Sequence, residues 1–241
     1  MSILKKSLIA VGLVAVGSSV QAQQVTANVG VTSDYIWRGI SQSSEAASVS
    51  GGVDYAHESG FYAGTWVGSL GDEGSGFSGS EVDLYLGYGG EAGEIGYDVG
   101  YIYYNYPTAE GDFGELYGSV SYDIFSAGFA YTLNGGNVDG VDNVLFDSGD
   151  IYLHVGVGVN LSETWTFAAT LATYLFDADG DVVGGVEQDV DYAFAQVDFG
   201  TSTDLGDFTI SIIGTDVDSN NTNFGNGDEE IKGVVSWGIS F

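Results

Sequence analysis

The chain has 241 residues, with 34 acidic side chains against 4 basic ones and a formal net charge of −30. This excess of negative charge excludes nucleic acid as a partner, because the phosphate backbone would be repelled. The sequence has no cysteine, which excludes disulfide bonds and thiolate metal sites. It combines many glycines and aromatic residues with a single proline.

The N-terminal segment predicts an export signal. Lys5 and Lys6 precede an apolar run at 8–16, and small residues that suit a cleavage site end at Ala22. The apolar run is too short to cross a bilayer as a helix. We expect residues 1–22 to be a signal peptide and residues 23–241 to be one mature domain, in which Arg38 and Lys232 are the remaining basic residues.

The mature domain alternates apolar and polar residues, which is typical of β-strands. No run of about eighteen apolar residues follows the signal, which excludes a helical membrane protein. In chain order, the expected strands are Val25–Trp37, Ala47–Ala56, Phe61–Leu70, Glu81–Gly89, Ile95–Tyr103, Glu115–Asp123, Ala127–Leu133, Ile151–Leu161, Trp165–Phe176, Asp189–Thr201, Phe208–Thr215 and Glu230–Phe241.

Long loops and short turns alternate between these strands, many of which have about the nine to eleven residues that cross a bilayer at a tilt. An even strand number with that alternation is typical of bacterial outer-membrane barrels. The sequence therefore predicts an all-β fold, an antiparallel transmembrane β-barrel of about twelve strands, with ten or fourteen left open. The short turns and both termini would face the periplasm.

One strand breaks the pattern. In the segment 189–201, Val190, Tyr192 and Phe194 favour one face, whereas Val197 and Phe199 favour the other. A β-bulge or a misread register would explain the change of face.

The last strand carries a further signal. Its apolar residues fall on one face and small or polar residues alternate with them, and it resembles the C-terminal strand of outer-membrane barrels, which is read by the barrel-assembly machinery. The apolar face comprises Val235, Trp237, Ile239 and Phe241.

The first half of the mature chain resembles a known family. The segment 31–42, Val-Thr-Ser-Asp-Tyr-Ile-Trp-Arg-Gly-Ile-Ser-Gln, is similar to the opening signature of the TorF-type porin family, and matches continue at 60–64, 81–88, 100–107 and 114–118. Over the second half the resemblance is one of general pattern only. It implies an outer-membrane β-barrel and a channel, and it supplies no substrate and no site residues.

Strand parity gives candidate pore residues near the start of the chain. If Val25 and its neighbours face lipid, Asp34 and Arg38 face the lumen, while Tyr35 and Trp37 face outward as interface aromatics. Arg38 is the single arginine of the chain. A buried charge needs a partner, so we expect Asp34 or water beside it. In a structural role, this ion pair would hold the strand end or fold a loop inward. In a functional role, its charges would shape the electric field across a constriction at the pore mouth.

Further lumen carboxylates come from the adjacent segments 81–89 and 94–103. Glu81, Asp83, Glu94 and Asp98 would cost free energy on a lipid face, so we place them in the lumen, and His154 has the same inward parity. With little basic charge to oppose them, these carboxylates either merely hydrate the lumen or favour cations. We take cation preference as the hypothesis.

Other kinds of site find little support. The acidic segment 177–181 starts like a calcium loop, but Val182 and Gln188 stand where an EF-hand has Gly and Glu. The two histidines, His57 and His154, are not placed for a lipase-type site. We predict no enzyme, no catalytic residue, no metal site and no cofactor.

The sequence thus predicts an outer-membrane porin of a Gram-negative bacterium that passes small hydrophilic solutes by diffusion. A second reading is a non-conducting barrel whose outer loops bind a ligand, with a lumen plugged by Tyr and Asp side chains and the Arg38 pair. A third, a soluble secreted β-protein, conflicts with the apolar terminal strand, whose edge would aggregate in water.

Overall fold

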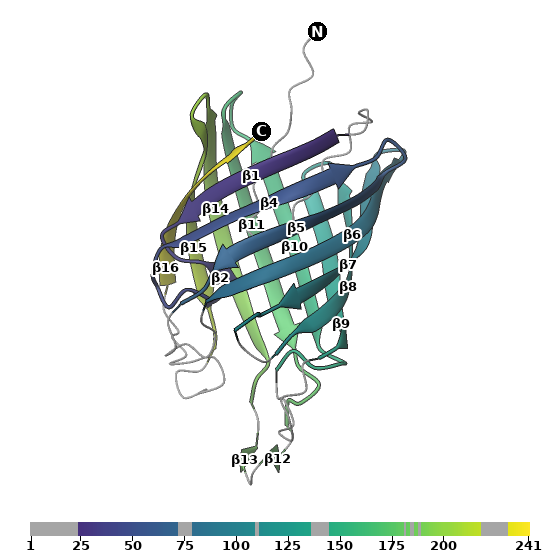
Figure 1. Ribbon diagram of the computed structural model, residues 1–241, viewed down its shortest axis with the longest axis vertical. Coiled ribbons are helices and arrows are strands. Elements are labelled where there is room, and N and C mark those ends of the chain that lie inside the picture. Colours follow the sequence, from purple (N-terminus) through teal and green to yellow (C-terminus); the bar gives the residue numbers. More distant parts are fainter. Residues whose placement is uncertain are drawn as a thin grey trace.

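The structure, a computed structural model, describes residues 24–71, 79–108, 111–135, 145–180, 182–183, 186–187, 189–217 and 231–241. In these ranges, twelve long strands close into one antiparallel barrel (Figure 1). The fold class and strand number predicted from sequence are confirmed. The predicted signal peptide lies outside the described residues.

The barrel wall runs in the order β1-β16-β15-β14-β11-β10-β9-β8-β7-β6-β5-β4. Its strands are β1 (Gln24–Thr32), β4 (Ser48–Ala56), β5 (Phe61–Ser69), β6 (Ser80–Ala92), β7 (Ile95–Asn105), β8 (Phe113–Tyr122), β9 (Phe125–Asn134), β10 (Ile151–Asn160), β11 (Trp165–Leu175), β14 (Tyr192–Thr203), β15 (Gly206–Thr215) and β16 (Ile231–Ser240). Two short hairpins are not part of the wall: β2 (Ile36–Trp37) with β3 (Ile40–Ser41), and β12 (Val182–Val183) with β13 (Val186–Glu187).

The first and last wall strands close the sheet. β1 pairs with β4 along its whole length and with β16 over Asn28–Thr32. Backbone bonds between Ala27 and Phe241, with N–O distances of 2.8 and 3.2 Å, complete the seam. Closure leaves no free edge for aggregation.

The two ends of the barrel differ. Short connections at 57–60, 93–94, 123–124, 161–164 and 204–205 lie at the end where β1 starts and β16 stops, which we call the turn end. The long connections lie at the opposite end, the loop end, where β12 and β13 project (Figure 1).

Alternation along each strand separates an apolar outside from a small or polar inside. On β10, Leu153 and Val155 are exposed on the outer surface, whereas Tyr152 and His154 face the lumen. The same pattern leaves many Val, Leu, Ile and Phe side chains exposed around the wall. Among the described residues, no helix is long and apolar enough to span a membrane.

The predicted change of face in the segment 189–201 has a different cause from a bulge. β14 pairs in continuous register with β11 and β15, and Ala195, Val197 and Phe199 face outward along it. Tyr192 and Phe194 are inward-facing and buried. The pattern changes because large aromatic side chains fill the lumen at the loop end, so apolar residues there point inward.

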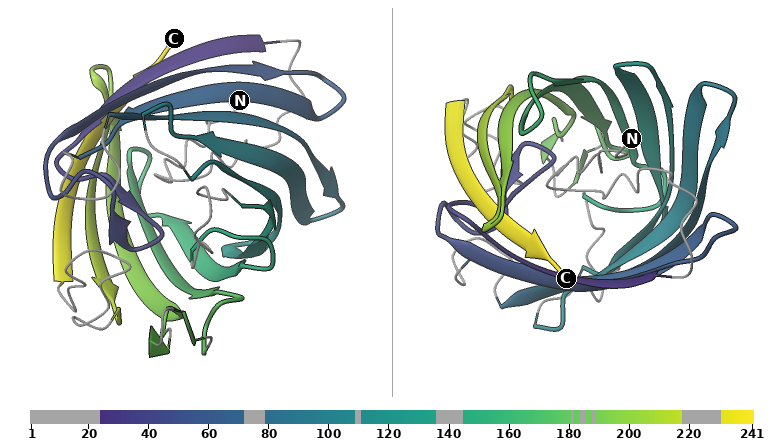
Figure 2. Two further views of the ribbon diagram at one scale, coloured as in Figure 1. Left: turned by 60° about the horizontal axis from the view of Figure 1, so that its bottom comes forward. Right: turned by 90° about the horizontal axis from the view of Figure 1, so that it is seen from above.

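The predicted first strand, Val25–Trp37, is too long. β1 ends at Thr32, and the chain then turns into the barrel as the β2–β3 hairpin (Figure 2). Tyr35 and Trp37, expected outside as interface aromatics, are 5% and 8% exposed in the interior. That prediction is wrong because parity applies only while the chain stays in the wall.

A charge on the outer face tests the assignment of faces. Leu171 lies in the middle of β11 and is 62% exposed on the outside, while its neighbour Thr170 faces the lumen. We predict that Leu171→Arg lowers the free energy of unfolding in lipid vesicles by about 2–4 kcal/mol. Thr170→Arg should cost much less, because its charge reaches lumen water. If urea titrations showed the same loss in the free energy of unfolding for both variants, the assignment of Leu171 to the outer face and Thr170 to the lumen would be contradicted.

Candidate functional site

A tight turn forms the tip of the inward hairpin. Trp37 pairs with Ile40, and the two residues between them, Arg38 and Gly39, have φ angles of 48° and 87°. Positive φ at both central positions is the geometry of a two-residue hairpin turn whose twist suits the flanking strands. Arg38 adopts this backbone conformation at some cost, since it favours glycine and asparagine.

The Arg38 side chain is held by a buried ion pair. Its Nη1 and Nη2 donate to the two carboxylate oxygens of Glu115 on β8, at 2.7 and 2.6 Å. The two side chains are 5% and 1% exposed. Tyr174 also donates to Glu115, at 3.2 Å, and Tyr192 donates to the backbone oxygen of Arg38, at 2.9 Å. The tip of the hairpin is thus hydrogen-bonded to two strands of the wall, β8 and β14, and Tyr174 of β11 bonds to its carboxylate partner.

Aromatic rings surround this ion pair. The guanidinium carbon of Arg38 lies 4.3 Å from the ring centroid of Trp37 and 4.2 Å from that of Tyr152. Trp37 in turn contacts four rings edge-on, at centroid distances of 5.5–6.1 Å: Tyr104, Phe113, Phe146 and Tyr174. The charge is therefore compensated by a carboxylate and by ring faces, both of which suit a guanidinium.

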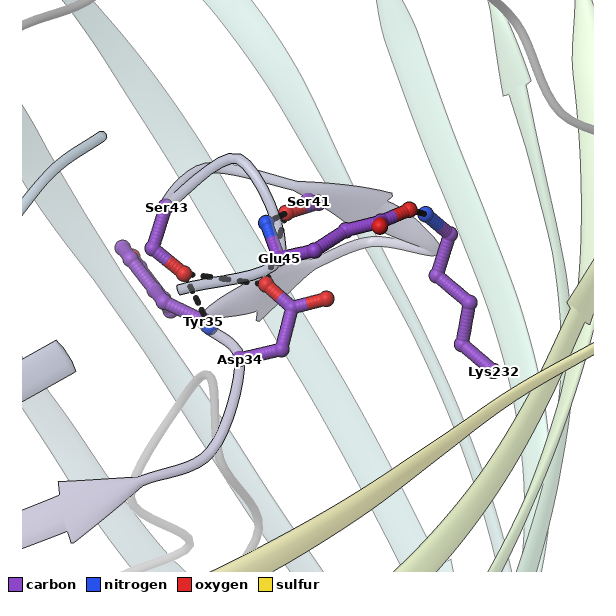
Figure 3. A network of polar contacts seen from close by, with 6 residues as sticks. All are labelled: Asp34, Tyr35, Ser41, Ser43, Glu45 and Lys232. Carbon is purple, nitrogen blue, oxygen red and sulfur yellow. Dashed lines mark hydrogen bonds and ion pairs between the residues drawn. The ribbon is translucent and has the colours of Figure 1, made fainter. Parts of the chain in front are cut away.

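A polar network fixes the base of the hairpin (Figure 3). Asp34 accepts bonds from the hydroxyls of Ser41 and Ser43, at 2.6 and 2.9 Å, and Ser43 Oγ accepts from the backbone N of Tyr35, at 2.8 Å. Lys232 on β16 donates to Glu45 at 2.8 Å, and this bond holds the pKa of Glu45 below its ordinary value. Asp34 therefore shapes the hairpin. From the sequence we expected Asp34 or water beside Arg38, but the partner of Arg38 is Glu115.

Next to Tyr35, two carboxyl groups of β6, those of Glu81 and Asp83, are buried. Tyr35 donates to Glu81 Oε1 at 3.2 Å. Glu81 is 1% and Asp83 6% exposed, and Asp83 Oδ1 has no hydrogen-bond partner among the described residues. The hairpin covers this pair.

At the loop end, buried inward side chains line almost the whole circumference of the lumen. The β2–β3 hairpin lies inside the barrel (Figure 2), and its residues Tyr35, Trp37 and Arg38 are buried among these side chains. They come from nine of the twelve wall strands: Ser48, Glu81, Asp83, Ile102, Tyr104, Phe113, Glu115, Ala130, Thr132, Ala172, Tyr174, Tyr192, Phe194, Ser211, Ile213 and Val234.

The half of the lumen nearer the turn end is polar and less crowded. Tyr62 donates to Asp98 at 2.7 Å, and Tyr85 donates to Asp54. Opposite them, Asp198 accepts from Gln196 and Ser211 on the wall of a cavity of about 130 Å³ between β10, β11, β14 and β15. The inner wall of this half therefore carries carboxyl and hydroxyl groups.

The structure separates the predicted pore residues into groups. Arg38 lies at the tip of the hairpin, and Glu81 and Asp83 lie beside the hairpin at the loop end. Asp98 lies in the less crowded half of the lumen near the turn end, which we call the open half. His154 faces the lumen and stacks on Tyr152 at 5.5 Å. Glu94 is exposed in the turn between β6 and β7, so it does not line the lumen. The sequence reading missed Glu115 and Tyr174, although both have inward parity on their strands and a lone arginine requires a buried acid.

Asp150, just before β10, is a further buried carboxyl group that the sequence reading missed. It accepts backbone bonds from Asp177 and Asp147, at 2.9 and 3.0 Å, and so joins two loops. Burial raises the pKa of Asp150 to about 6, although these bonds oppose the shift. Its contribution to stability is therefore present below the ordinary aspartate pKa and is lost as the pH rises through about 6.

A metal centre is not apparent in the part of the chain that the structure describes, where no three His, Asp or Glu side chains gather as ligands. The segment 177–181 lies only partly within the described residues. In it, Asp179 Oδ1 accepts the backbone N of Val190 at 2.8 Å, which is a structural use of the carboxylate.

Comparison with known proteins places the chain in a family. The model of a family described as "Bacterial protein of unknown function (Gcw_chp)" matches residues 17–238, and the chain belongs to this family. The comparison does not return the TorF-type family, so that resemblance stays a prediction. No curated protein is similar to the chain in sequence.

Solved structures with the same fold include porins. The NanC porin matches with a TM-score of 0.57 and 12% identity, covering 90% of this chain and 99% of that one. The KdgM porin matches with a TM-score of 0.55 and 8% identity, covering 90% and 98%. KdgM is also known in complex with disordered oligogalacturonate, at a TM-score of 0.54 and 7% identity, covering 90% and 97%. At these identities the likeness shows the shared barrel fold.

Trypsin can report where the hairpin lies, because Arg38 is the single arginine and stands at its tip. We predict that the folded wild-type barrel resists cleavage after Arg38 at mildly acidic pH. Glu115→Gln removes the charge partner, and losing one member of a buried pair costs about 3–5 kcal/mol, so this variant should be cut there.

The matched control is Glu94→Gln, which removes a carboxylate from an exposed turn at the opposite end. It should be as resistant as wild type. Sequencing of the fragments identifies the cut. Equal resistance of Glu115→Gln and wild type would show that the pair does not hold the hairpin in the lumen.

Proposed function

We propose that the protein is an outer-membrane channel of the porin type that passes small hydrophilic solutes, prefers cations, and is closed in the described state by the β2–β3 hairpin. The observation that carries this proposal is the division of the lumen into a polar, acidic half and a half filled by one inward-folded segment. A barrel without a transport function would not need a polar cavity next to the β2–β3 hairpin, a segment that contributes no strand to the wall.

The outer surface supports a membrane location. The wall exposes apolar side chains around its circumference, and a bilayer is the surrounding in which such a surface is stable. The fold shared with NanC and KdgM agrees with this location. We place the chain in the outer membrane of a Gram-negative bacterium after removal of residues 1–22. The apolar face of β16, which ends in the exposed Phe241, would be the strand that the assembly machinery reads.

Charge supports a preference for cations. Asp54, Asp98 and Asp198 face the open half of the lumen. The two basic residues of the mature chain are both bonded to carboxylates, Arg38 to Glu115 and Lys232 to Glu45. The oligogalacturonate bound by KdgM is an acidic polymer, which this lumen would repel. A cationic or neutral solute fits the charges better.

The second candidate is a barrel that never conducts and whose loops bind a ligand. The occlusion of the lumen at the loop end favours it. The two candidates differ in one respect: a closed channel opens when the hairpin is released, whereas a non-conducting barrel stays silent.

Conductance in planar bilayers separates them. We predict that wild type is mostly closed and that Glu115→Gln raises the open probability on the order of 100-fold, because the buried pair is broken. Glu94→Gln should behave as wild type. Silence of a correctly folded Glu115→Gln barrel that trypsin cuts at Arg38 would favour the second candidate.

Selectivity is measured on the opened channel. In the Glu115→Gln background, a KCl gradient should give a cation-selective reversal potential. Asp98→Asn combined with Asp198→Asn should move that potential toward zero, since two lumen charges are lost while the polar contacts are kept. An anion-selective potential before these substitutions would contradict the preference.

A further inference from the structure

The carboxyl pair on β6 lies beside the hairpin, and within the described residues neither basic side chain forms an ion pair with it. Glu81 and Asp83 are two residues apart on the inward face, and they are 1% and 6% exposed. Asp83 Oδ1 has no hydrogen-bond partner among the described residues. A protonated carboxyl group can donate a hydrogen bond, whereas an ionised carboxylate can only accept one.

The groups around the pair do not supply a compensating cation. The Arg38 guanidinium is engaged at both nitrogens by Glu115, whose own charge acts on Asp83. Among the described residues, the other titratable groups that face the pair are phenols, which are uncharged: Tyr35, Tyr104 and Tyr106. With both carboxyls ionised, two like charges would be buried together, and this arrangement is strongly unfavourable.

The hairpin is what keeps water from the pair. Tyr35 donates a hydrogen bond to Glu81, and its ring lies tilted against that of Trp66 at a centroid distance of 5.3 Å. When the hairpin leaves the lumen, Tyr35 leaves with it and water reaches both carboxylates. The closed state therefore binds a proton that the open state releases.

We propose that Glu81 and Asp83 form a proton switch, in which a single proton shared by the pair keeps the hairpin in the lumen and its loss releases the hairpin. The role of this switch in transport rests on the proposed channel function, but the movement of the hairpin does not. Since the closed state holds the extra proton, a rise in pH favours release.

Cleavage at Arg38 tests the switch. We predict that trypsin cuts the folded wild-type barrel faster as the pH rises from about 6 to about 9, by up to about 10-fold per pH unit, since one proton is released and cleavage follows the released population. Rates are normalised to a free arginine peptide at each pH. Only protein that runs as the folded, heat-modifiable form is scored.

Glu81→Gln and Asp83→Asn remove the need for the proton. In either variant an amide donates to the remaining carboxylate, so the buried charge no longer changes with pH. We expect both variants to resist trypsin over the whole range. His154→Gln and Asp150→Asn are matched controls, because each removes another titratable group from the loop-end half while leaving the pair intact. Both should keep the wild-type pH dependence.

Each outcome decides a separate claim. Cleavage of wild type that does not depend on pH, or pH dependence that persists in both Glu81→Gln and Asp83→Asn, overturns the switch. Dependence that disappears in Asp150→Asn assigns it to that carboxyl instead. A pH-dependent release in a barrel that never carries current supports the switch and defeats the channel function, so the two failures are distinguishable.

Discussion

The ion pair between Arg38 and Glu115 is the interaction on which the position of the β2–β3 hairpin inside the barrel depends. Transfer of two charges from water into a packed interior is expensive, and their attraction offsets that cost only when the geometry is good and the remaining donors are satisfied. Here the guanidinium is bidentate at 2.6 and 2.7 Å and is flanked by aromatic faces. The carboxylate also accepts from Tyr174. These contacts explain how a polar hairpin can lie inside a barrel with its single arginine buried.

The same rule of alternation builds both halves of the lumen. Inward positions near the turn end hold small residues, hydroxyls and acids. Inward positions near the loop end hold large rings that close around Trp37. Apart from one register shift between β8 and β9 at Gly114 and Glu115, the wall strands pair regularly. In the proposed channel, the filled half would open by moving a segment that contributes no strand to the wall. Opening therefore requires no change in the barrel itself.

Much of this architecture could be predicted from the sequence, because period-two alternation and turn residues act locally. The twelve strands and the outer faces of β6 and β10 follow from that pattern. The hairpin could not be placed in this way, since nothing local tells Trp37 to leave the wall. Its position is decided by Glu115 and Tyr174, which are distant in sequence. For the same reason the change of face along β14 could not be explained from the sequence: an apolar residue that faces a filled lumen, such as Tyr192 or Phe194, looks like one that faces lipid.

The central claim is that the hairpin itself blocks the channel. The most direct test is to record current through wild-type barrels in a bilayer, with trypsin added on the loop side. A hairpin that is cut after Arg38 while it is released cannot re-form its turn, so each cut channel should stay open. The account predicts stepwise, irreversible increases in current that match the fraction of chains cut at Arg38. Complete cleavage at Arg38 with no change in current would contradict it.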